Sequence, residues 1–340
     1  NPQKVNILFF DNDGIDIDKI IERKIETSFI REDFRRVPTD SFKRINHMSD
    51  CIEYYTRNLI NSLDIKDIKN KKLKIVVNIR SALLLDVVTK VFNELGISVK
   101  LYDEYRDLVG LSKLVKECNA NLGIYMSDDG ENAVIVDENG GIIKDEAFEA
   151  LNALVLLKTT KLKTLVAPVT ASVTIEKIAE LCDVKFVRSK ISQKHILEAY
   201  LKNEKMMSRN EIVSAYLTSL DVFNICLLTI NLMVNSNLPL SMITLEIPRY
   251  YSKKQEITCP WNMKGKVMRN IIEENSSETV DLIEGVKLNF EDAWVLVLPD
   301  SDEPLCRIYA ESKYLDEAER LSDVLLNKIQ VITKSEERAE

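Results

Sequence analysis

The stretch that most constrains the fold is LKIVVNI, from Leu73 to Ile79. It is rich in β-branched apolar residues, which is typical of a parallel strand buried on both faces of a sheet. The next stretch, SALLLDVVTKVFNEL, has the apolar spacing of a helix, with Ser81 placed as its N-cap and Gly96 just after its end. ISVKLY then predicts a second strand, so these three stretches predict a βαβ unit.

The same pattern occurs again further along the chain. TLVAPV, from Thr164 to Val169, predicts a strand, SVTIEKIAELC a helix capped by Ser172, and VKFVRS a strand. After Pro239 the stretches VDLIEGVKLNF, AWVLVLP and LCRIYAES predict antiparallel strands, and LDEAERLSDVLLNKI predicts a closing amphipathic helix. The sequence therefore predicts an α/β protein with two duplicated βαβ-type mixed-sheet domains and a smaller C-terminal α+β domain.

Composition excludes several classes of function. The net charge of -8 and the pI near 5.2 argue against binding to nucleic acid, which needs clustered Lys and Arg. The most apolar stretch, Val222 to Val234, is interrupted by Asn224 and Asn231, so we expect a buried core helix and no contact with a membrane. His47 and His195 are far apart, which makes a zinc site built on histidines improbable. The scattered cysteines form no C-x-x-C pair, so we expect reduced thiols and a cytoplasmic protein.

An acidic segment, GIYMSDDGENAVIVDENGG, lies between two apolar runs. Its carboxylates Asp128, Asp129 and Glu131 are oxygen ligands of the kind that a hard divalent cation prefers. Asp and Gly are also the residues that a tight turn requires. The segment therefore fits either a metal site or a solvated turn between two strands.

Taken together, these segments resemble the α-D-phosphohexomutases, which include phosphomannomutases and phosphoglucomutases, over essentially the whole chain. Family members have three duplicated α/β domains and a smaller fourth α+β domain around a cleft. Their first domain carries a phosphoserine in T-x-S-H-N-P, followed by N-G-x-K-F; here Asn1-Pro2 matches the end of that motif and NILFF, Asn6–Phe10, the stretch after it. The resemblance implies that the phosphoserine precedes Asn1, which leaves this chain without a catalytic residue.

The resemblance also implies four domain ranges. Residues 1–60 would be a remnant of domain I with a linker, and 61–150 would be the metal-loop domain II. Residues 151–250 would form the sugar-loop domain III and 251–340 the phosphate-loop domain IV. The sugar loop of the family, G-E-x-S-G-H, has no counterpart between Tyr200 and Leu220.

The metal loop of the family reads G-I-A-x-D-x-D-x-D-R and holds one Mg²⁺ together with the phosphoserine. In this chain the three aspartate positions hold Ser127, Asp129 and Glu131. Asp128 is a weaker candidate ligand, and Asn132 replaces the arginine. Because one aspartate of three remains, we expect magnesium to be the cofactor of the family but not to be bound here.

The phosphate clamp of the family reads R-P-S-G-T-E-P, and here the same place reads LPDSDEP, Leu298 to Pro304. Asp300 and Asp302 replace the serine and the threonine, which places two carboxylates where a phosphate dianion would bind. A like-charge contact at about 4 Å costs on the order of 1–4 kcal/mol. We expect Asp300 and Asp302 to be solvated loop residues. The candidates for binding a phosphate or sugar are Arg188, Lys190, Ser301, Glu303 and Arg307.

These patterns support three hypotheses about function. The first is a phosphomannomutase-like module without mutase turnover, fused behind a sugar-nucleotide transferase domain as in proteins similar to mannose-1-phosphate guanylyltransferases. Its partners would be a sugar phosphate and an upstream nucleotidyltransferase domain of the same chain. The sequence leaves open whether the protein also forms a homo-oligomer. The second is an active phosphohexomutase that uses the upstream phosphoserine and Mg²⁺, and the third is a binding module that keeps only the fold.

Overall fold

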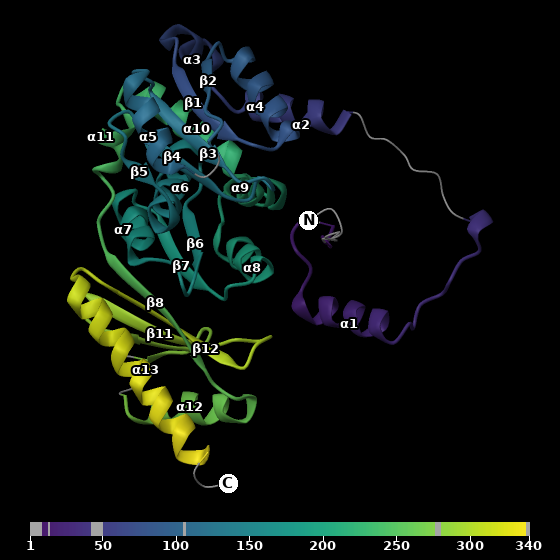
Figure 1. The fold of residues 1–340 in the computed structure, drawn as a ribbon, viewed down its shortest axis with the longest axis vertical. Helices are drawn as coiled ribbons and strands as arrows, with labels where there is room; N and C mark the ends of the chain where they lie inside the picture. Colours follow the sequence, from purple (N-terminus) through teal and green to yellow (C-terminus); the bar gives the residue numbers. More distant parts are fainter. Residues whose placement is uncertain (1–8, 13, 42–49, 105–106, 276–279, 338–340) are drawn as a thin grey trace. The chain divides into compact units, whose positions relative to one another are not determined.

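A computed structural model describes residues 9–12, 14–41, 50–104, 107–275 and 280–337 (Figure 1). The chain divides into two compact units. Unit 1 comprises residues 1–161 and 207–246, and unit 2 comprises residues 162–206 and 247–340. The four domain ranges expected from the sequence stay a prediction.

The sheet of unit 1 is mixed, in the order β2-β1-β3-β4-β5. The pairs β1–β2 and β1–β3 are parallel, whereas β3–β4 and β4–β5 are antiparallel. The strands are β1 (Lys74–Ile79), β2 (Ser98–Leu101), β3 (Leu122–Met126), β4 (Ala133–Asp137) and β5 (Ile142–Ile143). The run from Leu73 to Ile79 thus contains β1, an interior strand between β2 and β3 whose middle residues are buried, as its apolar composition predicts.

Helices enclose this sheet (Figure 1). They are α2 (Asp50–Asn61), α3 (Ile65–Lys71), α4 (Ala82–Glu94), α5 (Leu108–Glu117), α6 (Asp145–Thr159), α9 (Arg209–Leu220), α10 (Val222–Ser236) and α11 (Leu240–Thr244). The ring of Phe92 on α4 meets that of Phe223 on α10 edge to face, with centroids 5.8 Å apart. Most of α10 is buried, which confirms the predicted core helix. α9 was not predicted, because its apolar periodicity is weak.

Within the part of the chain that the structure describes, no single helix has the length and apolar composition needed to cross a membrane. The pair α9 and α10, bent by 94°, passes that test together.

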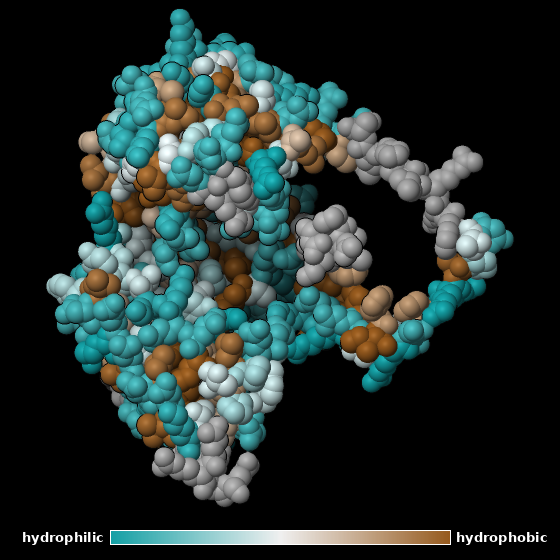
Figure 2. Space-filling view, viewed as in Figure 1, coloured by the Kyte–Doolittle hydropathy of each residue, from teal (hydrophilic) through white to brown (hydrophobic). Residues whose placement is uncertain are grey.

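The N-terminal segment contains α1 (Lys19–Ile30) and the short 3₁₀ helix η1 (Thr39–Ser41). Asp18 caps α1 by accepting a hydrogen bond from the backbone N–H of Ile20. No residue of α1 is buried, and Figure 2 shows apolar surface on this helix. Asn1-Pro2, the first residues of the NILFF match and His47 lie outside the described residues.

In unit 2, a parallel pair of strands carries two helices. The elements are β6 (Thr164–Pro168), α7 (Val173–Leu181), β7 (Lys185–Ser189) and α8 (Gln193–Asn203). The hydroxyl of Ser172 accepts a hydrogen bond from the N–H of Thr174, which confirms the predicted helix cap. This segment therefore forms the second βαβ unit that the sequence predicts.

The second sheet of unit 2 is antiparallel, in the order β8-β12-β11-β10-β9. Its elements are β8 (Tyr251–Thr258), α12 (Trp261–Glu273), β9 (Val280–Asp281), β10 (Val286–Asn289), β11 (Ala293–Pro299), β12 (Leu305–Ser312) and α13 (Leu315–Glu337). One face shares a core with α12 and α13 that includes Val267, Ile308 and Leu325. On the other face Trp294 and Leu296 pack against Val169. The predicted α/β class with a C-terminal α+β part is confirmed, although the polar edge strand β8 was not predicted.

Two glycines of unit 2 allow a matched test of the fold: Gly285, in the turn before β10, and Gly265, in α12. Gly285 has φ +69°, and a Cβ there would lie 2.4 Å from the carbonyl oxygen of Val297, so we expect Gly285→Ala to lower the free energy of unfolding by about 1–3 kcal/mol. Gly265 is in α12 with nothing within 4 Å of its Cβ position, so Gly265→Ala should raise it by about 0.5–1 kcal/mol. Urea unfolding followed by circular dichroism measures both, and equal stabilities would contradict the close approach at Gly285.

Candidate functional site

The acidic segment forms a tight turn between β3 and β4. The backbone N–H of Ser127 donates to the carbonyl of Asn132, and the N–H of Gly130, which has φ +75°, donates to the carbonyl of Ser127. The carboxylate of Asp129 accepts hydrogen bonds from the hydroxyl of Ser127 and from the N–H of Glu131, the latter at 3.0 Å. Asp129 therefore closes the turn.

These hydrogen bonds determine the charge state of the turn. The Ser127 hydroxyl, followed by the Glu131 N–H, lowers the pKa of Asp129 below its usual value, because both stabilise the ionised carboxylate. Asp128 and Glu131 are exposed. Among the residues described by the structure, no group of three His, Cys, Asp or Glu side chains is arranged to hold a metal ion. This turn thus does not fit Mg²⁺ by itself, and the metal assignment of Asp128, Asp129 and Glu131 stays a prediction.

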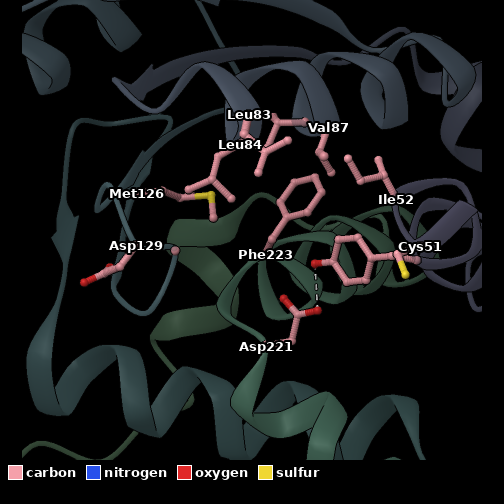
Figure 3. Close-up of a pocket in the computed structure, with 12 residues that line it drawn as sticks. Cys51, Ile52, Leu83, Leu84, Val87, Met126, Asp129, Asp221 and Phe223 are labelled. Atoms are coloured by element: carbon pink, nitrogen blue, oxygen red, sulfur yellow. Dashed lines mark hydrogen bonds between the residues drawn. The ribbon is translucent and has the colours of Figure 1, made fainter. Parts of the chain in front are cut away.

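A cavity of about 400 Å³ lies beside this turn in unit 1 (Figure 3). Its walls are mostly apolar, and the residues that dominate them are Leu83, Leu84, Val87, Met126 and Phe223. Asp129 and Gly130 also line it, but in Figure 3 the Asp129 carboxylate points away from the apolar side chains. None of the described residues that line the cavity is Lys, Arg or His, so it offers no cation to a phosphate.

A polar pair forms one end of this cavity. The hydroxyl of Tyr55, on α2, donates a hydrogen bond of 2.8 Å to the carboxylate of Asp221 (Figure 3). Asp221 also caps α10 by accepting from the N–H of Asn224. Burial, together with the negative charge of Asp221, raises the pKa of Tyr55. The pair therefore adds negative charge, which would repel a phosphate.

The LPDSDEP segment forms the turn between β11 and β12, and Asp300 is at its centre. One oxygen of the Asp300 carboxylate accepts the N–H groups of Asp302 and Glu303, both at 2.8 Å. The other oxygen is 2.6 Å from Nη1 of Arg307. Only 8% of this side chain is exposed, and these N–H groups, led by that of Asp302, lower its pKa. The expectation that Asp300 is a solvated loop residue is therefore wrong, because its carboxylate is folded back onto its own loop.

Lys264, on α12, stabilises the turn between β11 and β12. Its Nζ donates to the carbonyls of Asp300 and Glu303, both at 2.6 Å, and lies 3.6 Å from the centroid of the Trp261 ring. With its carbonyls bound on one side, the loop presents its N–H groups to the Asp300 carboxylate on the other. The side chain of Lys264 is buried against the loop.

The remaining candidates fall into separate places in unit 2. Arg307 lies between Asp300 and Glu256, and its Nη2 is 3.8 Å from Glu303. The hydrogen bond with Glu256 is the main reason why the pKa of Arg307 is raised. The hydroxyl of Ser301 donates to Asp302. The structure thus places Ser301 and Glu303 in the turn between β11 and β12, and Arg307 beside that turn on β12.

Arg188 and Lys190, both after the middle of β7, differ in environment. Lys190 is exposed. The side chain of Arg188 is 13% exposed, donates to the carbonyls of Pro168 and Ala171, and lies 3.3 Å from a carboxylate oxygen of Glu176. Burial lowers the pKa of Arg188, and Glu176 opposes that shift. Arg188 therefore serves packing within unit 2, whereas Lys190 is accessible to an anion.

Sequence reasoning missed three polar residues that the structure makes prominent. Lys264 lies outside the segments from which the sequence predicts a site, and Lys287 and Glu311 lie within predicted strands. Lys287 and Glu311 are 5% and 3% exposed. One observation could have indicated that Glu311 is buried, namely its cross-strand pairing with the buried Trp294. That pairing depends on a strand register that the sequence does not reveal.

Comparison with known sequences finds relatives that are named as mutases of sugar phosphates. A phosphoglucomutase/phosphomannomutase of Thermococcus kodakarensis is 25% identical, over 94% of this chain and 74% of that protein. A phosphoglucosamine mutase of Methanocaldococcus jannaschii is 26% identical, over 94% of this chain and 77% of that protein. The chain therefore spans about three quarters of the length of these relatives. No protein-family model matches it.

Comparison with solved structures gives the same fold. A phosphoglucomutase/phosphomannomutase family protein of Burkholderia thailandensis superposes with a TM-score of 0.70 at 14% identity, over 93% of this chain and 71% of that one. An N-acetylphosphoglucosamine mutase of Aspergillus fumigatus, solved with GlcNAc-6P and magnesium, gives 0.54 at 12% identity, over 86% of this chain and 68% of that one. At these identities the likeness shows the fold alone.

The turn between β3 and β4 yields a prediction about metal. We expect Asp129→Ala to lower the free energy of unfolding by about 1 kcal/mol, because it removes the acceptor that closes the turn, and Glu131→Ala to change it by less than about 0.5 kcal/mol. Millimolar Mg²⁺ should leave the melting temperature of the wild type unchanged. A Mg²⁺-dependent rise in melting temperature that both variants lose would contradict this interpretation and support a metal site.

Proposed function

We propose that this chain is a member of the α-D-phosphohexomutase superfamily and forms a phosphomannomutase-like module without mutase turnover of its own. A phosphohexomutase has to bind a hexose phosphate and keep a metal next to its phosphoserine. The observation that carries the proposal is the position of Asp300, whose carboxylate takes up the loop N–H groups and the guanidinium of Arg307.

The electrostatics of that loop support the proposal. A phosphate dianion would have to displace the Asp300 carboxylate from two N–H donors or bind beside it, and a like-charge contact at about 4 Å costs on the order of 1–4 kcal/mol. Arg307 is already surrounded by three carboxylates, those of Asp300, Glu256 and Glu303. Its positive charge is therefore offset before any ligand arrives.

Unit 1 supports the proposal independently. The turn at Asp129 is closed by its own hydrogen bonds, and the cavity beside it is lined by aliphatic and aromatic side chains. A hexose ester and a divalent cation need several oxygen ligands and hydrogen-bond partners. The cavity supplies such groups only at Asp129 and at the Tyr55–Asp221 pair, and the Asp221 carboxylate already accepts hydrogen bonds from Tyr55 and from the N–H of Asn224.

A module of this kind would act in assembly, regulation or sugar-phosphate sensing within a sugar-nucleotide biosynthesis protein. The partner we propose is a nucleotidyltransferase domain upstream in the same chain, similar to a mannose-1-phosphate guanylyltransferase. The length of the open reading frame tests this partner directly. An upstream nucleotidyltransferase region would support it, and a frame that extends only far enough to complete a mutase domain would overturn it.

The second candidate is an active phosphohexomutase. The relatives favour it, because proteins named as mutases match 94% of this chain over about three quarters of their own length. In that case Asp129 and Glu131 would help to hold Mg²⁺, and the phosphoserine would lie upstream of Asn1.

The two candidates differ in one assay. We expect the full-length protein, supplied with Mg²⁺ and a hexose 1,6-bisphosphate, to convert mannose 1-phosphate into mannose 6-phosphate no faster than background, because its loop does not hold the phosphate. Turnover above background that is lost when the upstream serine is replaced would overturn the first candidate and establish the second.

A matched pair of variants tests the physical cause. Asp300→Ser removes the carboxylate that fills the loop and frees two N–H donors, so we expect it to bind inorganic phosphate about tenfold more tightly than the wild type, a gain of about 1.4 kcal/mol. Asp302→Ser removes one negative charge from the same loop without freeing those donors, and serves as the control. NMR titration of the loop amides measures both, and equal affinities for the two variants would contradict the role given to Asp300.

A further inference from the structure

The C-terminal sheet of unit 2 is covered on its second face by the segment 162–206. Val169, which follows β6, packs against Trp294 and Leu296 of β11. The backbone N–H of Ile191 donates to the carboxylate of Glu284 at 2.7 Å. These contacts dock the βαβ segment on the sheet, and the polar groups between the two layers are consequently removed from water.

The carboxylate of Glu311 anchors this docking. It accepts hydrogen bonds from the hydroxyl of Ser172, from the N–H of Val173 at 2.8 Å and from the indole N–H of Trp294 at 2.7 Å. Val173 is the first residue of α7, so a negative charge stands at the positive end of that helix dipole. A buried carboxylate with three donors is a satisfied group, and it links the βαβ segment to β12.

Lys287 lies in the same interface and is less well satisfied. Its Nζ is 3.8 Å from the centroid of the Trp294 ring and 3.4 Å from the carbonyl oxygen of Val169. Burial, followed by the positive charge of Arg188, lowers the pKa of Lys287 to about 7, against the opposing effect of the nearby carboxylates. The charged groups that face it from the surrounding elements are Glu176 on α7, Arg188 on β7, Asp281 on β9 and Glu311 on β12.

We propose that Lys287 and Glu311 form a pH-responsive latch that holds the segment 162–206 on the C-terminal sheet, with tighter docking when Lys287 is neutral. The latch consists of Ser172, Arg188, Lys287, Trp294 and Glu311. The hydrogen bonds of Glu311 attach the segment to the sheet at every pH, and the protonation of Lys287 makes the strength of docking depend on pH. This inference does not depend on the proposed function.

The sign of the effect follows from proton linkage. Undocking would return Lys287 to water and to its ordinary pKa of 10.5, whereas the docked state has a pKa of about 7. Between these values the undocked state binds the extra proton, so docking tightens as the pH rises, by at most about tenfold per pH unit. Below about pH 7 both states are protonated, and Lys287 contributes no further pH dependence.

The protonation step can be observed through Trp294, because the protein has only two tryptophans. In a Trp261→Phe background we expect the emission of Trp294 to titrate with a midpoint near pH 7, since a cation over an indole ring perturbs its fluorescence. Lys287→Met in the same background should abolish that titration. A midpoint that survives Lys287→Met would assign it to another group and overturn the proposal.

Trp294→Phe provides the matched control. It leaves Trp261, whose ring also has a lysine amine over it, that of Lys264 at 3.6 Å. Adding Lys287→Met to this control should leave its emission unchanged at every pH. A change there would show that Lys287→Met acts on unit 2 generally and not through the Trp294 ring, and would contradict the proposal.

Docking itself is measured by hydrogen exchange at the amides of Val173 and Ile191, with wild type and Lys287→Met compared at the same pH so that the intrinsic exchange rate cancels. We expect the ratio of their opening constants, wild type over variant, to fall by up to about tenfold per pH unit between pH 7 and pH 9. The amides of β1 in unit 1 serve as the reference. A ratio that does not change with pH, or that changes equally in β1, would overturn the latch.

Two further variants separate the anchor from the switch. Glu311→Gln should weaken protection of the Val173 amide at every pH, because the charge at the start of α7 is lost. Lys287→Arg keeps the cation at all these pH values and should remove the pH dependence without tightening the docking. If Lys287→Met does not fold, Lys287→Arg still tests the proposal, because a pH-dependent ratio retained in that variant would contradict it.

Discussion

The carboxylates of this acidic protein bind backbone N–H groups of their own chain, and unit 2 in particular depends on this interaction. Glu204 is 3% exposed and accepts from the N–H groups of Lys163, Thr164, Lys205 and Met206. Burial raises the pKa of Glu204, but the four hydrogen bonds lower it by more, and the group stays ionised. Because an unsatisfied buried carboxylate would be costly, each such group fixes the backbone around it.

The same interaction explains why the candidate site differs from what a phosphate needs. A loop with N–H groups on one side is an anion site, and the anion can be a ligand or a side chain of the protein. In the loop before β12 that anion is the carboxylate of Asp300, which pairs with the guanidinium of Arg307. Lys264 stabilises the same loop by donating to its backbone carbonyls. In the turn before β4 the corresponding carboxylate is Asp129.

The sequence predicted much of the fold and only part of the site. The strand at Leu73–Ile79, the cap at Ser172 and the antiparallel strands near the C-terminus follow from local pattern, because apolar spacing and capping residues act over a few positions. The motif at Leu298–Pro304 located a loop, but whether Asp300 points into water or back into the loop depends on the register of β11 and β12. The metal and sugar assignments of the other candidates stay predictions.

By itself, the sequence determined the α/β class, the order of the strongly patterned elements and the positions of the loops, since these depend on periodicity and turn residues. The weakly periodic α9 and the polar β8 were not predicted from it. Only the tertiary structure decided that the side chains of Lys287 and Glu311 are buried. Both occupy the face of their strands opposite the core with α12 and α13, where alternation would place a polar residue in water. The segment 162–206 covers that face, and its contacts with Trp294 and Leu296 leave the two polar strand residues buried. Such a consequence depends on a contact between distant parts of the chain, which no local pattern encodes.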